Sequence, residues 1–198
     1  MITGYDKEKE RGQPDQTFEN IVTVIEKLFP AGKIRREMAF RMVGYLVFDA
    51  FVGNTDRHHQ NWGVLVERRN QPGSKGTFLL QLAPTFDHAS SLGREMTDEA
   101  RVRYLNDGTV ERYIRRGRGG IFEHAQAKHG MSPIALATML AQRYPEFFRP
   151  WQTRVANLEA NALHDLVGRV PGARMSQTSR TFVLAFLEIS RKLLGHAL

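Results

Sequence analysis

The sequence has no cysteine at any of its 198 positions, so disulfide bonds and thiolate metal sites are excluded. It also has no uninterrupted apolar run of the about 18 residues that a membrane-spanning helix needs. The first residues, MITGYDKEKERG, are polar and mixed in charge, unlike a signal peptide. These absences predict a cytoplasmic protein without a membrane partner.

The composition is typical of a soluble globular protein. Hydrophobic residues make up 41% and charged residues 25% of the chain. A length of 198 residues is sufficient for a sizeable core and predicts one domain over residues 1–198. The 28 Lys and Arg outnumber the 21 Asp and Glu, and the net charge of +7 favours an anionic partner. A nucleotide, a nucleic acid and an acidic protein all fit that charge.

Hydrophobic spacing predicts a mainly α-helical fold with one β-hairpin. Thr17 is expected to cap a helix that ends at Pro30, and a second helix is expected over residues 33–52. Gly53 can end this helix in the left-handed conformation. The apolar residues assigned to its core face are Ile34, Met38, Met42, Leu46, Val47, Phe48, Ala50 and Phe51.

Strands are predicted for residues 62–67 and 77–82, on either side of the turn-rich segment ERRNQPGSKG. Only helices are expected after residue 97. Their predicted starts are Thr97, Thr109, the Ser132-Pro133 pair, Trp151 and Ser176, and the helix from Trp151 is expected to continue to Val167.

Side chains suited to catalysis are concentrated in NTDRHHQN, residues 54–61, just after the second predicted helix. The carboxylate of Asp56 can accept a proton, and the amide oxygen of Asn61 is a hard ligand suited to magnesium. Asp87 lies just past the second predicted strand and offers an anionic oxygen. Because the ends of an antiparallel hairpin lie side by side, Asn61 and Asp87 are expected to converge on a shared metal. A base with two oxygen ligands fits phosphoryl transfer.

These residues also resemble a known family, the HipA-like kinases. The wording Asn54-Thr55-Asp56-Arg57-His58-His59-Gln60-Asn61 follows the family pattern N-x-D-x-H-x-x-N, with Gln60 where many members have Lys. Leu82-Ala83-Pro84-Thr85-Phe86-Asp87 follows L-A-P-x-[YF]-D, and His88-Ala89 stands where protein kinases have Phe-Gly. The run from Asp56 to Asn61 is also similar to the phosphatidylinositol kinases, although a lipid substrate is not expected because no membrane-binding segment is present.

The resemblance implies a kinase C-terminal lobe that uses ATP and Mg²⁺ to phosphorylate Ser or Thr on a protein or on itself. By that resemblance Asp56 would be the catalytic base and His58 a group near the transferred phosphate. Asn61 and Asp87 would bind the magnesium and, through it, the nucleotide.

The resemblance covers the catalytic lobe, roughly residues 1–198, without an N-terminal lobe. Before residue 48 there is no strand with a phosphate-binding Lys, no Glu to pair with it and no Gly-rich loop. We therefore expect a fragment, a truncated gene product, or one half of a split kinase that needs an N-lobe subunit. HipA-like kinases are commonly toxins with a small DNA-binding antitoxin, so the resemblance also implies an antitoxin-like partner.

Other interpretations stay open at this point. Without an N-lobe the chain fits a catalytically inactive, kinase-like binding module or an inert remnant. The basic segment 112–118, with Arg112, Arg115, Arg116 and Arg118, is a weaker candidate for nucleic-acid binding.

Two further hypotheses concern the loop histidines and serines. His58, His59 and His88 with Asp56 and Asp87 would suit zinc or iron, and hence a hydrolase, but adjacent loop histidines rarely face one metal. Ser90 and Ser91, in the small polar stretch after Asp87, are candidates for phosphorylation and are more commonly ordinary loop residues.

Overall fold

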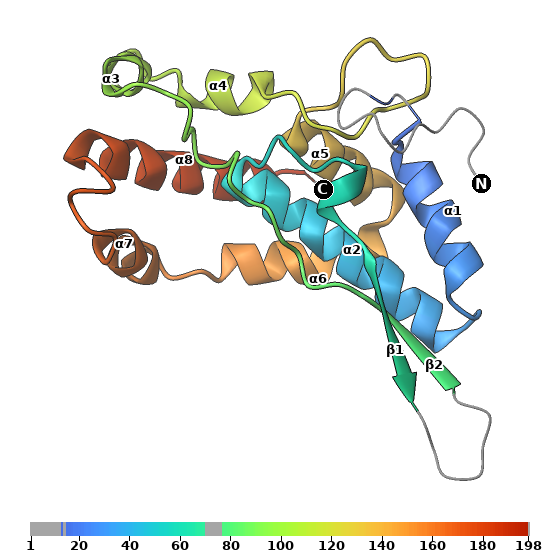
Figure 1. Cartoon of the computed structure of the whole chain (residues 1–198). Coiled ribbons are helices and arrows are strands. Elements are labelled where there is room, and N and C mark those ends of the chain that lie inside the picture. The colour runs from blue at the N-terminus through green and yellow to red at the C-terminus, as the bar shows by residue number, and fades with distance from the viewer. Residues whose placement is uncertain (1–12, 14, 70–76, 198) are drawn as a thin grey trace.

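The computed structural model describes residue 13, residues 15–69 and residues 77–197. This part of the chain holds eight α-helices and one two-stranded sheet, so the predicted fold class is confirmed. One long helix, α2 (Lys33–Val52), passes through the middle of the molecule, as Figure 1 shows. The helices packed against it are α1 (Phe18–Leu28), α5 (Pro133–Arg143), α6 (Pro145–Ala156) and α8 (Gln177–Gly195).

The bounds of α2 agree with the prediction, and Gly53 ends it with a left-handed φ of 66°. Its residues Met42, Val43 and Leu46 are buried in the core. Ile34 and Phe48, predicted on the same face, are 50% and 41% exposed, so this assignment was wrong. Ile34 lines an open groove between α2 and the hairpin, and the Phe48 ring packs edge-on against the His88 ring.

A glycine lets α2 and α6 approach closely. A Cβ atom on Gly44 would lie 2.3 Å from the Trp151 ring, so no larger residue fits there. The Trp151 ring stacks on Phe40 at 4.8 Å, and its indole nitrogen donates to the Phe40 carbonyl at 2.9 Å. This contact joins the middle of α2 to α6.

The predicted hairpin is present and projects from the helical body (Figure 1). Strands β1 (Val64–Arg69) and β2 (Thr77–Leu82) are antiparallel, with Val64 opposite Leu82. The first strand begins two residues later than predicted because His59–Asn61 form a short 3-10 turn, η1. Most of the predicted turn, residues 70–76, lies outside the described residues.

Hydroxyl side chains cap four helices at the positions predicted. The side chains of Thr17, Thr97, Ser132 and Ser176 each accept a hydrogen bond from the backbone amide three residues on. Thr97 starts α3 (Asp98–Asn106), and α4 (Val110–Arg116) follows it. These short helices lie over one side of α8, with which both are in contact.

The single helix predicted over residues 151–167 was wrong. The chain forms α6, which begins at Pro145 and includes Pro150, and then α7 (Ala160–Gly168). The break at residues 157–159 has neither Pro nor Gly, and the carbonyl of Leu158 there accepts a hydrogen bond from Arg191 of α8 at 3.1 Å. Tertiary contact therefore accompanies a break that the local sequence does not signal.

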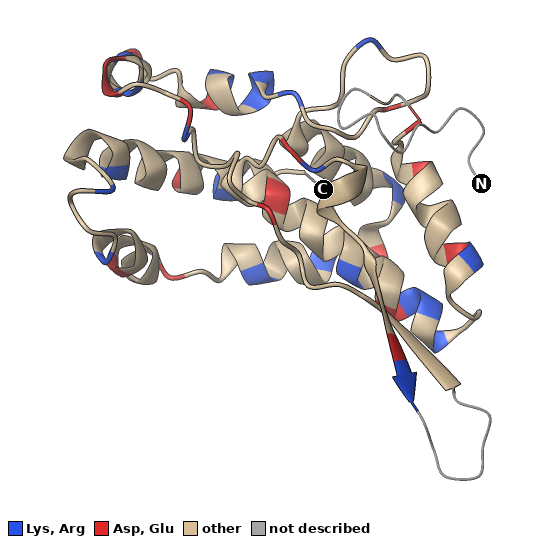
Figure 2. Cartoon of the chain, viewed as in Figure 1, with Lys and Arg blue, Asp and Glu red and all other residues tan. Residues whose placement is uncertain are grey.

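The surface charge is dispersed. Figure 2 shows Lys and Arg on many elements, with Asp and Glu interspersed, rather than in one stripe over residues 112–118. Arg115 of that segment is paired with Glu111 at 2.7 Å. Within the described ranges no helix is both long enough and apolar enough to cross a bilayer.

Candidate functional site

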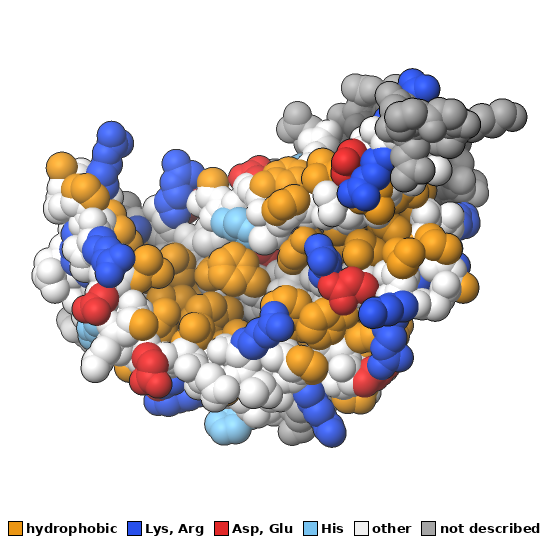
Figure 3. All heavy atoms as spheres, turned by 90° about the horizontal axis from the view of Figure 1, so that it is seen from below, with side chains coloured by type: hydrophobic (Ala, Val, Ile, Leu, Met, Phe, Trp, Pro, Cys, Tyr) orange, Lys and Arg blue, Asp and Glu red, His pale blue; other side chains and the backbone are white. Residues whose placement is uncertain are grey.

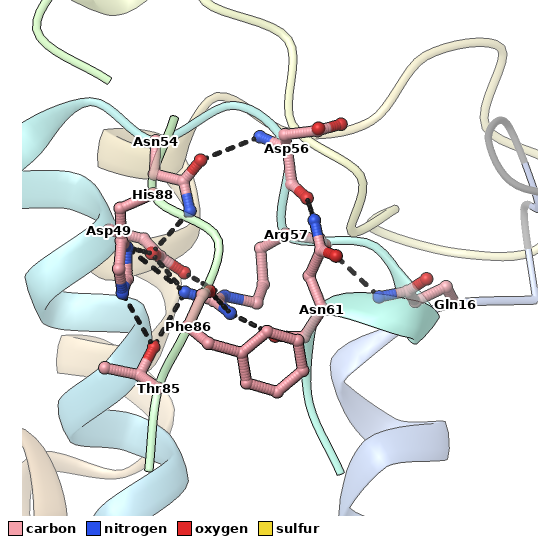
Figure 4. Close-up of polar contacts among 9 residues, drawn as sticks. All are labelled: Gln16, Asp49, Asn54, Asp56, Arg57, Asn61, Thr85, Phe86 and His88. Atoms are coloured by element: carbon pink, nitrogen blue, oxygen red, sulfur yellow. Dashed lines mark hydrogen bonds and ion pairs between the residues drawn. The ribbon is translucent and has the colours of Figure 1, made fainter. Parts of the chain in front are cut away.

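A buried ion pair connects the end of α2 to the loop that follows it. Asp49, in the last turn of α2, is 2% exposed and Arg57 is 3% exposed. The Nε and Nη2 atoms of Arg57 donate to the two carboxylate oxygens of Asp49 at 2.7 and 2.8 Å. The Asn54 side-chain amide donates to the same carboxylate at 2.9 Å (Figure 4). The pair is bidentate, which fixes the orientation of the guanidinium.

The same guanidinium joins two segments that are distant in sequence. Its Nη1 atom donates to the carbonyl of Asn61 and, at 3.1 Å, to the carbonyl of Phe86. Its Nη2 atom also donates to the Thr85 hydroxyl at 2.8 Å. The Arg57 side chain thus links the backbone of Asn61 to the backbone of Phe86, the residue before Asp87 (Figure 4).

Two asparagines shape the loop around Asp56. The Asn54 side-chain oxygen accepts from the Asp56 amide at 3.1 Å, and the Asn61 side-chain amide donates to the Asp56 carbonyl at 2.7 Å. With its nitrogen used in this way, Asn61 keeps its side-chain oxygen free of hydrogen bonds from the residues described. That oxygen is the atom a hard cation would bind, so the residue fits the predicted role of magnesium ligand.

His58 lies beside Asp56. Its Nδ1 accepts from the Gln60 amide at 3.3 Å, so a neutral ring carries its proton on Nε2. Nε2 lies 3.9 Å from the Asp56 carboxylate. The two side chains line a cavity of about 200 Å³, together with Ser90 and Arg118. The arrangement puts a carboxylate and a ring N–H at one opening.

The backbone of the basic loop after α4 forms the far wall of this cavity. The Gly119 amide donates to the Met131 carbonyl at 2.8 Å, and a Cβ on Gly120 would lie 2.8 Å from the Arg57 carbonyl. Gln16 donates to that Arg57 carbonyl at 3.2 Å. The exposed side chain of Arg118 has no hydrogen bond or ion pair with any residue in the described ranges. The basic segment 112–118, which the sequence suggested as a weaker candidate for nucleic-acid binding, therefore contributes Arg118 to the cavity of Asp56.

Asp87 occupies a left-handed conformation, with φ at 55°, which is uncommon for a residue other than glycine. Both neighbours are held: Phe86 by Arg57, and His88 through its Nε2, 3.1 Å from the Thr85 hydroxyl. His88 Nδ1 also lies 3.5 Å from the Asp49 carboxylate. The exposed Asp87 thus projects from a fixed backbone beside Asn61's segment, and a metal shared by the two side chains stays a prediction.

Burial alone would raise the pKa of Asp49. Hydrogen bonds from Arg57, His88 and Asn54, together with the charge of Arg57, outweigh burial and lower this pKa below its usual value. Asp49 is therefore ionised at neutral pH, and the centre of the site is a true ion pair.

The sequence had not assigned roles to Asp49 or Arg57, and it had considered His88 only as a possible zinc or iron ligand. A usable signal was present: an acid inside the apolar helical run at residues 47–52, with an arginine shortly after the helix ends. An acid in such a run is rarely buried without a paired cation.

The zinc or iron hypothesis finds no support. Among the residues described, no group of three or more His, Cys, Asp or Glu is placed to hold a metal. His88 reaches Asp49, whereas His58 lies by Asp56. Of the two candidate phosphorylation sites, Ser91 is buried and Ser90 lines the cavity of Asp56.

Comparison with known proteins gives a likeness in fold, without a match in sequence. No family model and no curated protein matches the sequence. Among solved structures, the chain is similar to the Helicobacter pylori proinflammatory kinase CtkA, with a TM-score of 0.67 and 18% sequence identity. The match covers 93% of this chain and 60% of that kinase. The chain therefore has a kinase-like fold and spans about 60% of the length of the kinase that it matches.

Proposed function

We propose that this chain is the catalytic lobe of an ATP- and magnesium-dependent phosphotransferase acting on Ser or Thr of a protein, or of itself. The observation that carries the proposal is the pair of hydrogen bonds from Arg57 to the carbonyls of Asn61 and Phe86. They hold the loop of the candidate base next to the segment of the candidate anionic ligand. The kinase-like fold supports the same assignment.

In this mechanism Asp56 accepts the proton of the acceptor's hydroxyl group. The hydroxyl oxygen forms a bond to the γ-phosphorus of ATP, and the bond between the γ-phosphorus and the oxygen that leaves with ADP breaks. The Asn61 side-chain oxygen and the Asp87 carboxylate would hold magnesium, which would neutralise the phosphate charge. His58, which lines the same cavity with its Nε2 3.9 Å from the Asp56 carboxylate, would donate to the γ-phosphate.

Arg118 is assigned to the acceptor side of the site. It shares a cavity with Asp56 and His58, and neither Asn61 nor Asp87 lines that cavity. A cation that lines the cavity of the base without the metal ligands suits an acidic group near the acceptor hydroxyl. The proposal therefore includes a preference for acceptors with a neighbouring acid.

A second lobe, supplied by another polypeptide, would cover the hairpin. Leu65, Val66, Phe78 and Leu79 of its two strands are exposed, and a groove of about 490 Å³ separates β2 from the first half of α2. In the view of Figure 3, hydrophobic side chains form a broad band broken by Lys and Arg. Apolar surface of this kind marks interaction sites. HipA-like character and an antitoxin-like partner belong to this proposal on the strength of the two motifs.

The direct test is transfer of labelled phosphate from Mg-ATP to the chain itself or to a general acceptor protein. Asp56→Ala should abolish transfer while the circular dichroism spectrum and the denaturant midpoint stay unchanged. Asp107→Ala, at an exposed acid beyond α3, is the matched control and should transfer normally. Equal transfer by Asp56→Ala would refute the assignment of the base. Transfer that appears only with an added N-lobe polypeptide would identify the split kinase, and nucleotide binding without transfer would identify a binding module.

A further inference from the structure

A second cavity, of about 530 Å³, lies between the loop after Asp87, α3, and the connection from α7 to α8. None of its lining residues belongs to the cavity of Asp56. Its wall carries three arginines, Arg94, Arg101 and Arg174, against one acid, Asp98. The excess of positive charge calls for an anion.

The acid on the wall is already engaged. Asp98 accepts from Arg101 Nη1 at 2.8 Å, and the Ser176 hydroxyl also hydrogen-bonds to it. Arg94 has only a 3.5 Å contact with its exposed neighbour Glu95, a pair of little strength in water. The Arg174 side chain has no hydrogen bond or ion pair with the residues described. Two of the three guanidiniums are thus available to a ligand.

Two polar groups on this wall are buried without a partner. Ser91 and Arg101 are each only 9% exposed, and among the described residues neither the Ser91 hydroxyl oxygen nor the Arg101 Nε has a hydrogen-bond partner. Buried polar atoms of folded proteins nearly always have a hydrogen-bond partner. Where no protein group supplies it, the partner is a bound water or ion. Both residues line this one cavity, where a bound ligand or water would supply the missing partners.

The N-terminal end of α8 adds positive potential to this cavity. The 19-residue helix α8 begins at Gln177, and its cap Ser176 together with Ser179 lines the cavity. The N-terminus of a helix carries partial positive charge and attracts anions. Here it supplements the arginines and the unpartnered donors.

We propose that this cavity binds a phosphoryl group, either on a phosphorylated side chain of a protein or as free phosphate. A phosphoryl group offers three acceptor oxygens, which suits guanidiniums and hydroxyls that converge from several elements. Arg101 Nη2 also donates to the carbonyls of Gly93 and Arg94, at 3.0 and 3.4 Å. The ligand would therefore contact Arg101, the residue whose hydrogen bonds hold the backbone at Gly93 and Arg94.

The test is calorimetric titration of the full chain, without magnesium or nucleotide, with inorganic phosphate and with one serine peptide in phosphorylated and unphosphorylated form. The expected result is saturable 1:1 binding of phosphate that Arg174→Ala weakens on the order of tenfold, and that Arg174→Lys weakens less. A phosphopeptide that binds more tightly than phosphate would identify a protein ligand, and equal affinities would identify the free anion.

Control variants separate this site from its surroundings and from the proposed catalytic site. Arg169→Ala removes an exposed arginine from the same connection, outside the cavity lining, and should leave phosphate affinity unchanged. Asp87→Asn should leave it unchanged as well, whether or not the chain transfers phosphate. Ser91→Ala, which deletes the unpartnered hydroxyl, should weaken binding severalfold without loss of stability. Absence of saturable binding in the folded chain, or equal affinity in Arg174→Ala, would overturn the proposal.

Discussion

The guanidinium of Arg57 donates two hydrogen bonds, of 2.7 and 2.8 Å, to the carboxylate of Asp49, and both side chains are almost completely buried. The remaining donors of Arg57 reach the carbonyls of Asn61 and Phe86. The ion pair therefore sets the separation between the loop of Asp56 and the segment of Asp87.

Asp49→Ala should destabilise the fold by about 3–5 kcal/mol, because it leaves the buried charge of Arg57 without its partner. The free energy of unfolding in denaturant measures this loss. The matched control is Glu37→Ala, which removes the acid of an exposed pair with Arg41, also at 2.8 Å. There the loss attributable to the ion pair should be at most about 0.5 kcal/mol. Similar losses in the two variants would show that the buried pair is not a support of the fold.

The stability should fall in acid in a way that depends on Asp49. Since the pKa of Asp49 is lower in the folded chain than in the unfolded chain, its contribution is complete above the usual value of about 3.9. It is lost as the pH falls from there through the folded-state pKa. The difference in unfolding free energy between the native chain and Asp49→Asn should therefore shrink below about pH 4. A difference that stays constant down to pH 2 would contradict the lowered pKa.

Gly120→Ala should disturb the site directly. The added methyl would lie 2.8 Å from the Arg57 carbonyl and 3.1 Å from the His58 Cα, so the catalytic loop or its neighbour must move. A loss of about 1–3 kcal/mol is expected for such overpacking. Gly168→Ala is the control, because no atom lies within 4 Å of its Cβ position at the end of α7, and it should leave stability unchanged or raised. Thermal or denaturant unfolding of both variants decides the matter.

Arg118→Ala should raise the KM for an acceptor peptide with an acid beside the serine, by about tenfold, with kcat nearly unchanged. The reason is that Arg118 lines the cavity of Asp56 and has no partner among the described residues. Peptides with Asp or with Lys beside the serine should be compared for the native chain, Arg118→Ala and Arg118→Lys. Arg112→Ala, on the exposed side of α4, serves as the control and should not change this preference. An unchanged ratio between the two peptides in Arg118→Ala would exclude the assigned role.

Much of the fold follows from local rules. The start and end of α2, the left-handed Gly53 and the four hydroxyl caps are all determined by nearby residues, and each was predicted. The division into α6 and α7 was not predictable, because the break at Leu158 is held by Arg191 of a different helix. The helix was predicted to start at Trp151 because a proline, Pro150, precedes it and proline usually marks a helix boundary, whereas here Pro150 lies inside α6.

The site could be predicted only as far as its motifs reach. Asp56, Asn61 and Asp87 were predicted from residue type and spacing and His58 from the resemblance alone, whereas the ion pair beside them was not predicted. Asp49 belongs to a helix and Arg57 to a loop, and only the turn after Gly53 brings them together. The place of Arg118 beside Asp56 was not predictable either, because the close approach of Gly120 to the Arg57 carbonyl joins segments far apart in sequence.

Calorimetric titration of Mg-ATP and Mg-ADP into the native chain and into Asp87→Asn tests the central claim most directly. The account predicts binding that requires magnesium and that Asp87→Asn loses while it keeps the native unfolding free energy. Nucleotide binding of equal affinity in Asp87→Asn, or a folded chain that binds no nucleotide even when an N-lobe polypeptide is supplied, would contradict it.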